Sequence, residues 1–203
     1  MGWPMRVLLA DDHQIFREGI KLLLAARSPH QVIAETGDGG ALKDLVKEHL
    51  PDLLLLDYPM PRCEMTAAID YLKKRYMRLR IVVLTDARSG VLLGKLHDAG
   101  ADAILLKQES GQCLLDAIEH VAAGNTFLSP AVFEQMGDAK IKLTMREFQV
   151  LRLLCRGLSS IEIAESFCLS DRTIGKHREN LFRKLNVSSA AQLINRAQQL
   201  DLL

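Results

Sequence analysis

The sequence lacks the marks of several protein classes. No apolar run among its 203 residues is long enough to span a bilayer, and residues 1–5 contain no apolar segment typical of a signal peptide. None of its four cysteines forms a CxxC pair or has a histidine nearby at metal-ligand spacing. The phosphate-loop pattern GxxxxGK[ST] is also absent, which excludes a P-loop enzyme. We therefore expect a cytoplasmic protein with reduced thiols and no association with a membrane.

The charge of the chain is small but unevenly distributed. The formal net charge is +1. Residues 1–137 carry 15 Lys and Arg against 18 Asp and Glu, whereas residues 138–203 carry 11 against 7. An acidic part followed by a basic part suggests two domains, of which the second has an anionic partner.

Short apolar runs alternate with amphipathic stretches in the first part of the chain. The runs are residues 6–10, 31–34, 53–56, 81–84 and 103–106. Between and after them, apolar residues recur at helical spacing, for example Phe16, Ile20, Leu23 and Leu24. Five strand–helix alternations predict an α/β fold with a doubly wound, five-stranded parallel sheet and right-handed crossovers.

Asp57 follows the most apolar of these runs directly. Four leucines, residues 53–56, indicate a strand buried on both faces, and the prolines at 59 and 61 end it. Asp57 therefore lies at the carboxyl end of a buried strand, the edge at which open α/β sheets bind ligands. The alternative interpretation is an aspartate that only begins a turn.

Polar residues also follow three other predicted strands. Asp11 and Asp12 follow the first strand, Thr85 follows the fourth and Lys107 follows the fifth. Carboxylates gathered at one edge favour a hard cation such as Mg²⁺, and a carboxylate beside a metal and a lysine can accept a phosphoryl group. Taken singly, each residue has a simpler explanation. Asp11 and Asp12 would form a polar turn, Thr85 would cap a strand end, and Lys107 would be a surface lysine. Their joint occurrence at successive strand ends favours a phosphotransfer site.

Residues 5–122 resemble a response-regulator receiver domain, which has a flavodoxin-like (βα)5 fold. The resemblance implies that Asp57 is the phosphoacceptor, with Thr85 as the switch hydroxyl and Lys107 as the family's lysine. It further implies Mg²⁺ held by Asp11, Asp12, Asp57 and the carbonyl of Pro59. The phosphoryl group would come from a sensor histidine kinase or a small phosphodonor.

The sequence departs from the receiver pattern at four positions. Ile104 replaces an aromatic residue, Met65 replaces a glycine, and Asp86 replaces a small residue. At Pro59 the family uses the backbone N–H to bind a phosphoryl oxygen, and proline has no N–H. These changes favour, as an alternative, an atypical receiver regulator that binds DNA independently of phosphorylation.

The last third of the chain has the pattern of a small helical domain. Thr144 with Glu147 and Ser159 with Glu162 form capping-box patterns, and Ser170 and Ser189 are suitable N-caps. We expect four helices, one of them at residues 161–167 and one at residues 171–185. Residues 124–141 are expected to be a linker with at most one helical turn, at residues 132–136.

The predicted helix at residues 171–185 is basic and amphipathic, and follows a shorter helix and a tight turn. This arrangement is typical of a helix-turn-helix motif whose second helix enters the major groove. The alternative is a charged helix that only faces solvent. The residues expected to contact double-stranded DNA are Arg172, Thr173, Lys176, His177, Arg178, Glu179, Arg183 and Lys184.

Residues 142–203 resemble the LuxR-type DNA-binding domain. The matching residues are Leu143, Thr144, Glu147, Val150, Leu151, Gly157, Leu158, Ser159, Ile163, Ala164, Leu169, Ser170, Thr173, Ile174, His177, Lys184 and Leu185. With the receiver pattern, this resembles the NarL/FixJ class of bacterial transcription regulators. The resemblance implies a homodimer on DNA, with groove-facing Lys176 and Glu179. Gly175 departs from the family pattern, which commonly has lysine there.

We therefore expect a receiver domain at residues 1–123, a linker at residues 124–141 and a DNA-binding domain at residues 142–203. The expected protein is a two-component response regulator that controls transcription, not an enzyme. The enzymatic alternative is a phosphohydrolase with an aspartate nucleophile. That chemistry needs an acid two residues after Asp57, where the sequence has Pro59.

Overall fold

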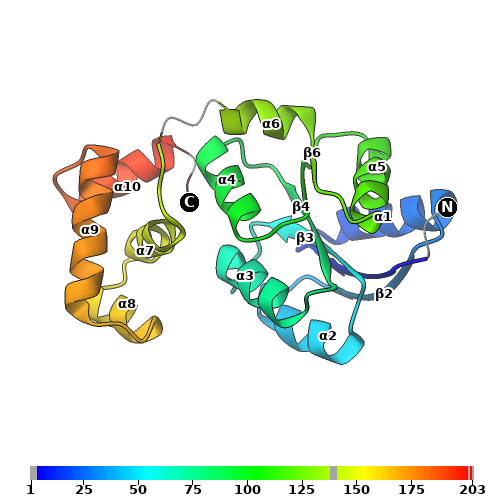
Figure 1. Ribbon diagram of the computed structural model, residues 1–203, viewed down its shortest axis with the longest axis horizontal. Helices are drawn as coiled ribbons and strands as arrows, with labels where there is room; N and C mark the ends of the chain where they lie inside the picture. Colours follow the sequence, from blue (N-terminus) through cyan, green and yellow to red (C-terminus); the bar gives the residue numbers. More distant parts are fainter. Residues whose placement is uncertain (1–3, 138–140, 201, 203) are drawn as a thin grey trace. The chain divides into compact units, whose positions relative to one another are not determined.

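The computed structural model describes residues 4–137, 141–200 and 202 (Figure 1). The chain divides into two compact units, one of residues 1–87 and 96–134 and the other of residues 88–95 and 135–203. Among the residues described, no helix combines the length and the apolar character needed to cross a membrane.

A parallel sheet forms the centre of the first unit, as the sequence predicts. Its strands lie in the order β2-β1-β3-β4-β5-β6. They are β1 (Arg6–Ala10), β2 (Gln31–Thr36), β3 (Leu53–Tyr58), β4 (Arg80–Thr85), β5 (Ala103–Leu106) and β6 (Phe127–Leu128). All six residues of β3 are buried, which explains its almost entirely apolar sequence.

The sheet has six strands, so the prediction of five was wrong. The additional strand, β6, lies within residues 124–141, where the sequence suggested only a linker. It pairs in parallel with β5, and its Phe127 N–H donates to the carbonyl of Asp102 at 2.9 Å. A strand of two residues is too short to show the alternation that identifies strands in a sequence. The same segment contains α6 (Pro130–Gly137), which is longer than the single turn expected.

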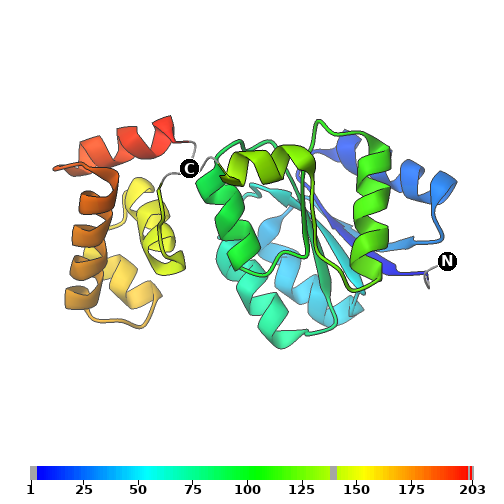
Figure 2. The ribbon, with the colours of Figure 1, turned by 45° about the horizontal axis from the view of Figure 1, so that its top comes forward.

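Helices cover both faces of the sheet (Figure 2). On one face, buried side chains of α1 and α5 pack with alternate residues of β1, β3, β4 and β5. The other face carries α2 and α3 (Figure 1). The helices before β6 are α1 (Gln14–Arg27), α2 (Leu42–His49, after a 3-10 turn at Gly39–Ala41), α3 (Met65–Arg75), α4 (Gly90–Asp98) and α5 (Gly111–Ala122).

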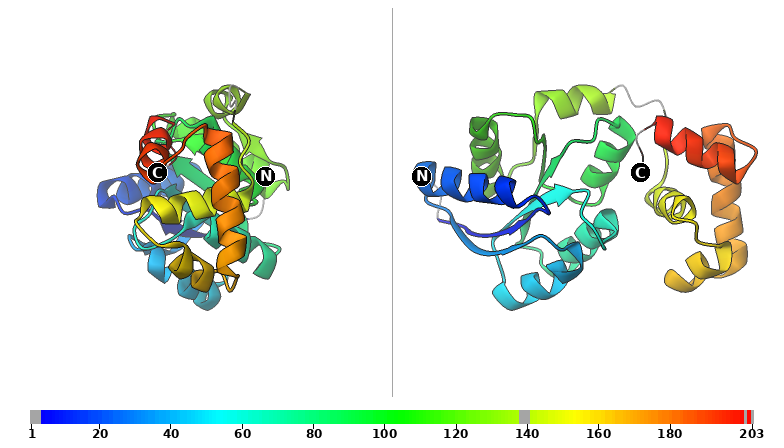
Figure 3. Two further views of the ribbon diagram at one scale, coloured as in Figure 1. Left: turned by 90° about the vertical axis from the view of Figure 1, so that its left-hand side faces the viewer. Right: turned by 180° about the vertical axis from the view of Figure 1, so that it is seen from behind.

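Four helices follow in the last third, as predicted (Figure 3). They are α7 (Met145–Cys155), α8 (Ser160–Ser166), α9 (Asp171–Leu185) and α10 (Ala190–Gln199). Complete capping boxes begin α7 at Thr144 and α8 at Ser159, which confirms both predictions. Ser170 and Ser189 cap α9 and α10 as expected.

An ion pair between the exposed Lys184 and the buried Glu147 connects α7 with α9. Lys184 Nζ lies 2.6 Å from Glu147 Oε2, and Glu147 is only 2% exposed. Burial by itself would raise the pKa of Glu147, but the bonds from Lys184 and Thr144 hold this pKa below its usual value. Glu147 therefore caps α7 and also fixes the position of α9.

The structure predicts that Gly175→Ala stabilises the protein. A Cβ added at Gly175 would have no heavy atom within 4 Å, so alanine fits without strain. Because glycine inside a helix costs about 0.5–1 kcal/mol relative to alanine, the free energy of unfolding should rise by about that amount. Urea unfolding of both proteins measures the change.

Gly157→Ala is the matched control for this measurement. Gly157 follows α7 with φ +88°, a conformation that alanine adopts only with strain, although its surroundings are equally open. The control should destabilise the protein. A loss of stability in Gly175→Ala would contradict the assignment of Gly175 to an unstrained helical position, and a gain in Gly157→Ala would contradict the strain expected at Gly157.

Candidate functional site

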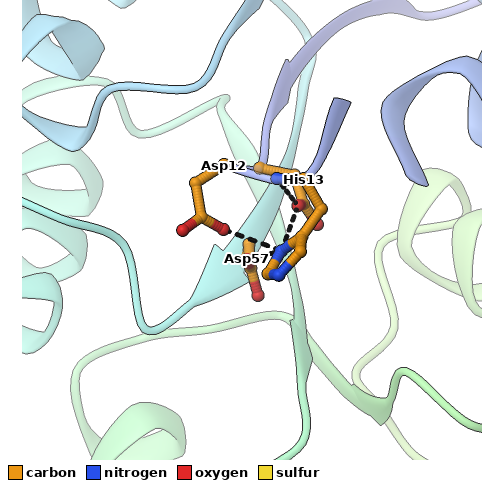
Figure 4. A group of neighbouring side chains, drawn as sticks. Asp12, His13 and Asp57 are labelled. Atoms are coloured by element: carbon orange, nitrogen blue, oxygen red, sulfur yellow. Dashed lines mark hydrogen bonds and ion pairs between the residues drawn. The ribbon is translucent and has the colours of Figure 1, made fainter. Parts of the chain in front are cut away.

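Three carboxylates meet at the carboxyl edge of the sheet. Asp11 and Asp12 follow β1 directly, and Asp57 is the fifth residue of β3. Asp11 and Asp57 are buried, whereas Asp12 is partly exposed. We call these three residues the acidic site, and Figure 4 labels two of them, Asp12 and Asp57. The parallel pairing of β1 with β3 places the ends of both strands side by side, which the sequence pattern predicted.

Lys107 lies between the two buried carboxylates. Its Nζ is 2.8 Å from Asp57 Oδ2 and 2.9 Å from Asp11 Oδ2. Burial opposes the positive charge of Lys107, but its close contacts with Asp57 and Asp11 and their negative charges outweigh this effect and raise its pKa. Lys107 therefore stays positively charged beside Asp57. A negatively charged group attached to Asp57 would find its counter-charge there.

The surroundings of Asp57 disfavour the charged form of its carboxyl group. Burial, opposed by the hydrogen bond from Lys107 and reinforced by the charge of Asp11, raises its pKa to about 7. The positive charge of Lys107 therefore does not offset the combined effect of burial and of Asp11 on the pKa of Asp57. An additional cation beside Asp57 would favour its ionised form, which is the nucleophilic form.

Thr85 and Pro59 complete the neighbourhood of Asp57. Thr85 ends β4 and is fully buried, and its hydroxyl donates to the carbonyl of Tyr58 at 2.9 Å and accepts from Ala87 N at 3.0 Å. Pro59 is exposed directly after β3, and the Tyr58–Pro59 peptide is cis. Asp86, also exposed, lines the same cavity as Lys107.

His13 also lies at the acidic site, although its residue pattern did not single it out as a site residue. His13 is the residue before α1, and its ring makes no capping hydrogen bond to the helix. Its Nδ1 lies 2.8 Å from Asp12 Oδ1 and 3.3 Å from Asp11 Oδ1. The available signal was its position directly after two acids at a strand end.

The donor atoms of the acidic site fit a divalent cation. Asp11, Asp12, Asp57 and His13 each offer a ligand atom, and these atoms all lie within 4.8 Å of one another. Asp11 Oδ2 is buried and accepts no hydrogen bond of good geometry, although Lys107 Nζ lies 2.9 Å away. Carboxylate oxygens are the ligands that hard divalent ions prefer. The site therefore has the chemistry of a cation site.

The eight residues expected to contact DNA all lie on α9, but not all of their side chains are equally available. Arg172, Lys176 and Glu179 are exposed. Arg178 donates to Ser160 Oγ at 2.6 Å, which connects α9 with α8. Lys184 is occupied by Glu147, as described above. The remaining three are Thr173, which bonds the cap Ser170, His177, which is half-buried, and Arg183, which donates to Asn180.

A polar groove of about 880 Å³ lies between α8 and α9. Its lining residues are Ser159, Ser160, Ile161, Asp171, Arg172, Gly175, Lys176, Arg178 and Glu179. Because Gly175 has no side chain, the groove is open at the middle of α9. The α9 side of the groove therefore presents three cations, Arg172, Lys176 and Arg178, and two acids, Asp171 and Glu179, around a gap.

Both parts of the chain match known families. Residues 7–119 match the response regulator receiver domain, and residues 142–197 match the bacterial regulatory proteins of the luxR family. The chain therefore belongs to the response regulators that join a receiver domain to a LuxR-type DNA-binding domain. This finding confirms the NarL/FixJ resemblance seen in the sequence.

Individual relatives match over nearly the whole chain. The nitrate/nitrite response regulator protein NarP of Escherichia coli (strain K12) is 36% identical over 92% of this chain and 91% of its own length. The virulence regulator BvgA of Bordetella pertussis is 31% identical over 97% and 98%. The structure of RcsB from Salmonella enterica serovar Typhimurium bound to promoter rprA with phosphomimetic BeF3- has a TM-score of 0.78. Its identity is 27%, and the match covers 97% of this chain and 99% of that one.

Proposed function

We propose that this response regulator binds promoter DNA as a homodimer through α9 and is controlled by phosphorylation of Asp57. The proposed domains are residues 1–123 as receiver and 142–203 as DNA-binding domain, joined by residues 124–141. The observation that carries the proposal is the contact of the buried Asp57 with Lys107 at 2.8 Å, beside Asp11 and Asp12. Such a regulator acts where the chromosome is, in the cytoplasm, as a transcription factor and not as an enzyme.

The roles proposed at the acidic site follow from its geometry. Asp57 receives the phosphoryl group, which comes from a sensor histidine kinase or a small phosphodonor. Asp11, Asp12, Asp57 and the carbonyl of Pro59 hold Mg²⁺, which supplies compensation of negative charge when bound. Lys107 already contacts Asp57 and is placed to hold an oxygen of the phosphoryl group. Thr85 can offer its hydroxyl only by releasing Tyr58.

The phosphoacceptor role predicts a specific loss in Asp57→Asn. Incubation with acetyl phosphate and Mg²⁺ should add one phosphoryl group to the wild-type protein and none to the variant, because the amide lacks the nucleophilic oxygen. Mass spectrometry of proteolytic fragments locates the group. A phosphoryl group on Asp11 or Asp12 would show that the site has been assigned to the wrong carboxylate.

The DNA-binding role rests on the exposed basic residues of α9 and on the helix-turn-helix arrangement of α8 and α9. Ser170 caps α9, and the bond from Arg178 to Ser160 fixes the two helices against each other. The similar RcsB structures include one described as two dimers bound to two parallel DNAs. A dimer on two half-sites about one helical turn apart fits a recognition helix too small to specify a site alone.

Glu179→Lys is expected to strengthen non-specific DNA binding and to steepen its salt dependence. Glu179 is exposed in the groove beside Lys176, so the substitution replaces a repelled charge with one attracted to phosphate. Each additional phosphate that the protein neutralises changes the slope of log affinity against log salt by about 0.9. Fluorescence anisotropy with a random duplex at several salt concentrations measures the slope.

Lys176→Ala is the opposite substitution on the same face and should weaken binding. Lys43→Ala is the control for net charge. It removes an exposed lysine of α2, which lies outside the four helices α7 to α10. The assignment of this face fails if Glu179→Lys leaves the slope unchanged, or if Lys43→Ala weakens binding as much as Lys176→Ala.

The alternative, DNA binding independent of phosphorylation, is favoured by three residues near Asp57. Pro59 supplies no N–H to a phosphoryl oxygen, and Asp86 adds an exposed negative charge on the same side. Ile104, on β5, is buried where the family commonly has an aromatic residue. Equal operator affinity of unphosphorylated wild type and of wild type treated with acetyl phosphate would select this alternative.

A further inference from the structure

We propose that His13 is a ligand of the cation bound at the acidic site. The site would then bind divalent transition ions that favour imidazole, such as Co²⁺, Ni²⁺ and Zn²⁺, more tightly than a site of carboxylates alone would bind them. The inference rests on the proposed function to the extent that a divalent cation binds among Asp11, Asp12 and Asp57.

The distances around the His13 ring are those of ligands to one ion. Its Nδ1 lies 2.8 Å from Asp12 Oδ1, 3.3 Å from Asp11 Oδ1 and 3.8 Å from Asp57 Oδ2. With bonds of about 2.0–2.2 Å, neighbouring ligands of one cation are about 3 Å apart and opposite ligands about 4.3 Å apart. Figure 4 shows the ring beside the carboxylates of Asp12 and Asp57, with its nitrogen on their side.

The backbone holds His13 at this place, and the ring remains available. The N–H of His13 donates to Asp11 Oδ1 at 2.8 Å, which fixes the residue next to the buried carboxylate. The side chain is 69% exposed and does not cap α1. Its Nδ1 faces the three acids and adds one more ligand atom to theirs, all within 4.8 Å of one another.

The buried oxygen of Asp11 is a second, independent indication of a cation. Asp11 Oδ2 has almost no contact with solvent and receives no hydrogen bond of good geometry, although Lys107 Nζ is 2.9 Å away. Buried carboxylate oxygens are normally satisfied by donors or by metals. A divalent cation among the acids would give this carboxylate a partner in addition to Lys107, and His13 Nδ1 already lies 3.3 Å from its other oxygen, Oδ1.

The choice of ion follows from the chemistry of the donors. Carboxylate oxygens suit Mg²⁺, whereas an imidazole nitrogen suits Co²⁺, Ni²⁺ and Zn²⁺. Transition ions bind most sites more tightly than Mg²⁺ does, so a high Co²⁺ affinity alone would not show that His13 is a ligand. The signature of His13 is the fall in the ratio of Co²⁺ affinity to Mg²⁺ affinity when the imidazole is removed.

The experiment measures Co²⁺ and Mg²⁺ affinities of the untagged full chain by isothermal titration calorimetry, for wild type, His13→Ala and His97→Ala. Losing even an outer partner of a metal ligand costs about 10–100-fold in affinity, so His13→Ala should lower Co²⁺ affinity by at least about tenfold. Its Mg²⁺ affinity should stay within about threefold of wild type. His97 is an exposed histidine of α4 that does not belong to the group of Asp11, Asp12, His13 and Asp57, and its removal should change neither affinity.

A second readout identifies the ligand directly. The visible absorption of bound Co²⁺ reports an imidazole ligand, and its bands should shift in His13→Ala and not in His97→Ala. An unchanged affinity ratio together with unchanged bands would overturn the role of His13 and leave the Mg²⁺ site intact. Absence of binding by either ion to the wild-type protein would overturn both this inference and the cation site of the proposed function.

Discussion

Asp57→Asn is expected to raise the free energy of unfolding at pH 8 by about 2 kcal/mol in buffer free of divalent ions. Burial and the charge of Asp11 raise the pKa of Asp57 to about 7, despite the hydrogen bond from Lys107. At pH 8 the folded protein therefore contains an ionised carboxylate in a place that disfavours it. One pKa unit corresponds to about 1.4 kcal/mol, and the loss of the Lys107 ion pair offsets part of the gain from asparagine.

The stabilisation by Asp57→Asn should depend on pH in a defined direction. A folded-state pKa above the unfolded value means that the folded protein binds more protons, so the stability contributed by the neutral carboxyl is lost as pH rises. The loss begins near the unfolded pKa of 3.8 and is complete above about 7. The advantage of the variant should therefore grow across this window and remain constant above it.

Urea unfolding at pH 5, 6, 7 and 8 with EDTA measures this advantage. Asp70→Asn is the matched control, because Asp70 is a partly exposed surface acid whose partner, Lys74, is also on α3. Its effect should be small at every pH. An advantage of Asp57→Asn that is the same at pH 5 and pH 8 would contradict the raised pKa, as would a net destabilisation at pH 8.

Pro59→Asn is expected to tighten beryllofluoride binding in Mg²⁺ by about tenfold or more. In the receiver pattern, the residue two positions after the phosphoacceptor donates its backbone N–H to a phosphoryl oxygen, and Pro59 has no N–H. A hydrogen bond to a charged group contributes about 1.5–3 kcal/mol, and each 1.4 kcal/mol is about tenfold in affinity. Pro59 is exposed directly after β3, so the change of side chain removes no contact from the core.

Titration of wild type and Pro59→Asn with beryllofluoride tests the missing donor, with Asp86→Ala added to each protein in a second pair. Asp86 is exposed and lines the cavity next to Lys107, so its removal should tighten binding further by reducing repulsion. The similar RcsB structure was obtained in the presence of this phosphomimetic. If wild type binds as tightly as Pro59→Asn, another group supplies the donor and the atypical-receiver interpretation loses its main support.

Much of the fold was accessible from local patterns. The bounds predicted for β1 and β5 match the structure, because each contains a continuous apolar run that ends at a polar residue, Asp11 after β1 and Lys107 after β5. The start of α9 was predicted correctly, because Ser170 is an N-cap and the helix has a clear amphipathic period. The meeting of Asp11, Asp57 and Lys107 followed from topology, since parallel strands bring their carboxyl ends to one edge.

The features that the sequence did not reveal depend on tertiary structure. β6 is defined by its partner β5, and two residues carry no periodic signal. The ion pair of Glu147 with Lys184 joins residues that are 37 positions apart in the sequence. From the sequence, Lys184 was expected to contact DNA. His13 has an ordinary position before a helix, and its place beside three carboxylates is set by the packing of β1 against β3.

Thr85 limits how strongly phosphorylation can bias this receiver. Its hydroxyl already donates to Tyr58 and accepts from Ala87, so turning to a phosphoryl oxygen exchanges one bond for another. A neutral hydrogen bond contributes about 0.5–1.5 kcal/mol and one to a charged group about 1.5–3 kcal/mol, which leaves a difference of roughly 1 kcal/mol. That difference shifts the populations of two conformations by only about fivefold. A receiver that depended on this hydroxyl alone would behave as a graded regulator, with a measurable active fraction before any phosphoryl group arrives.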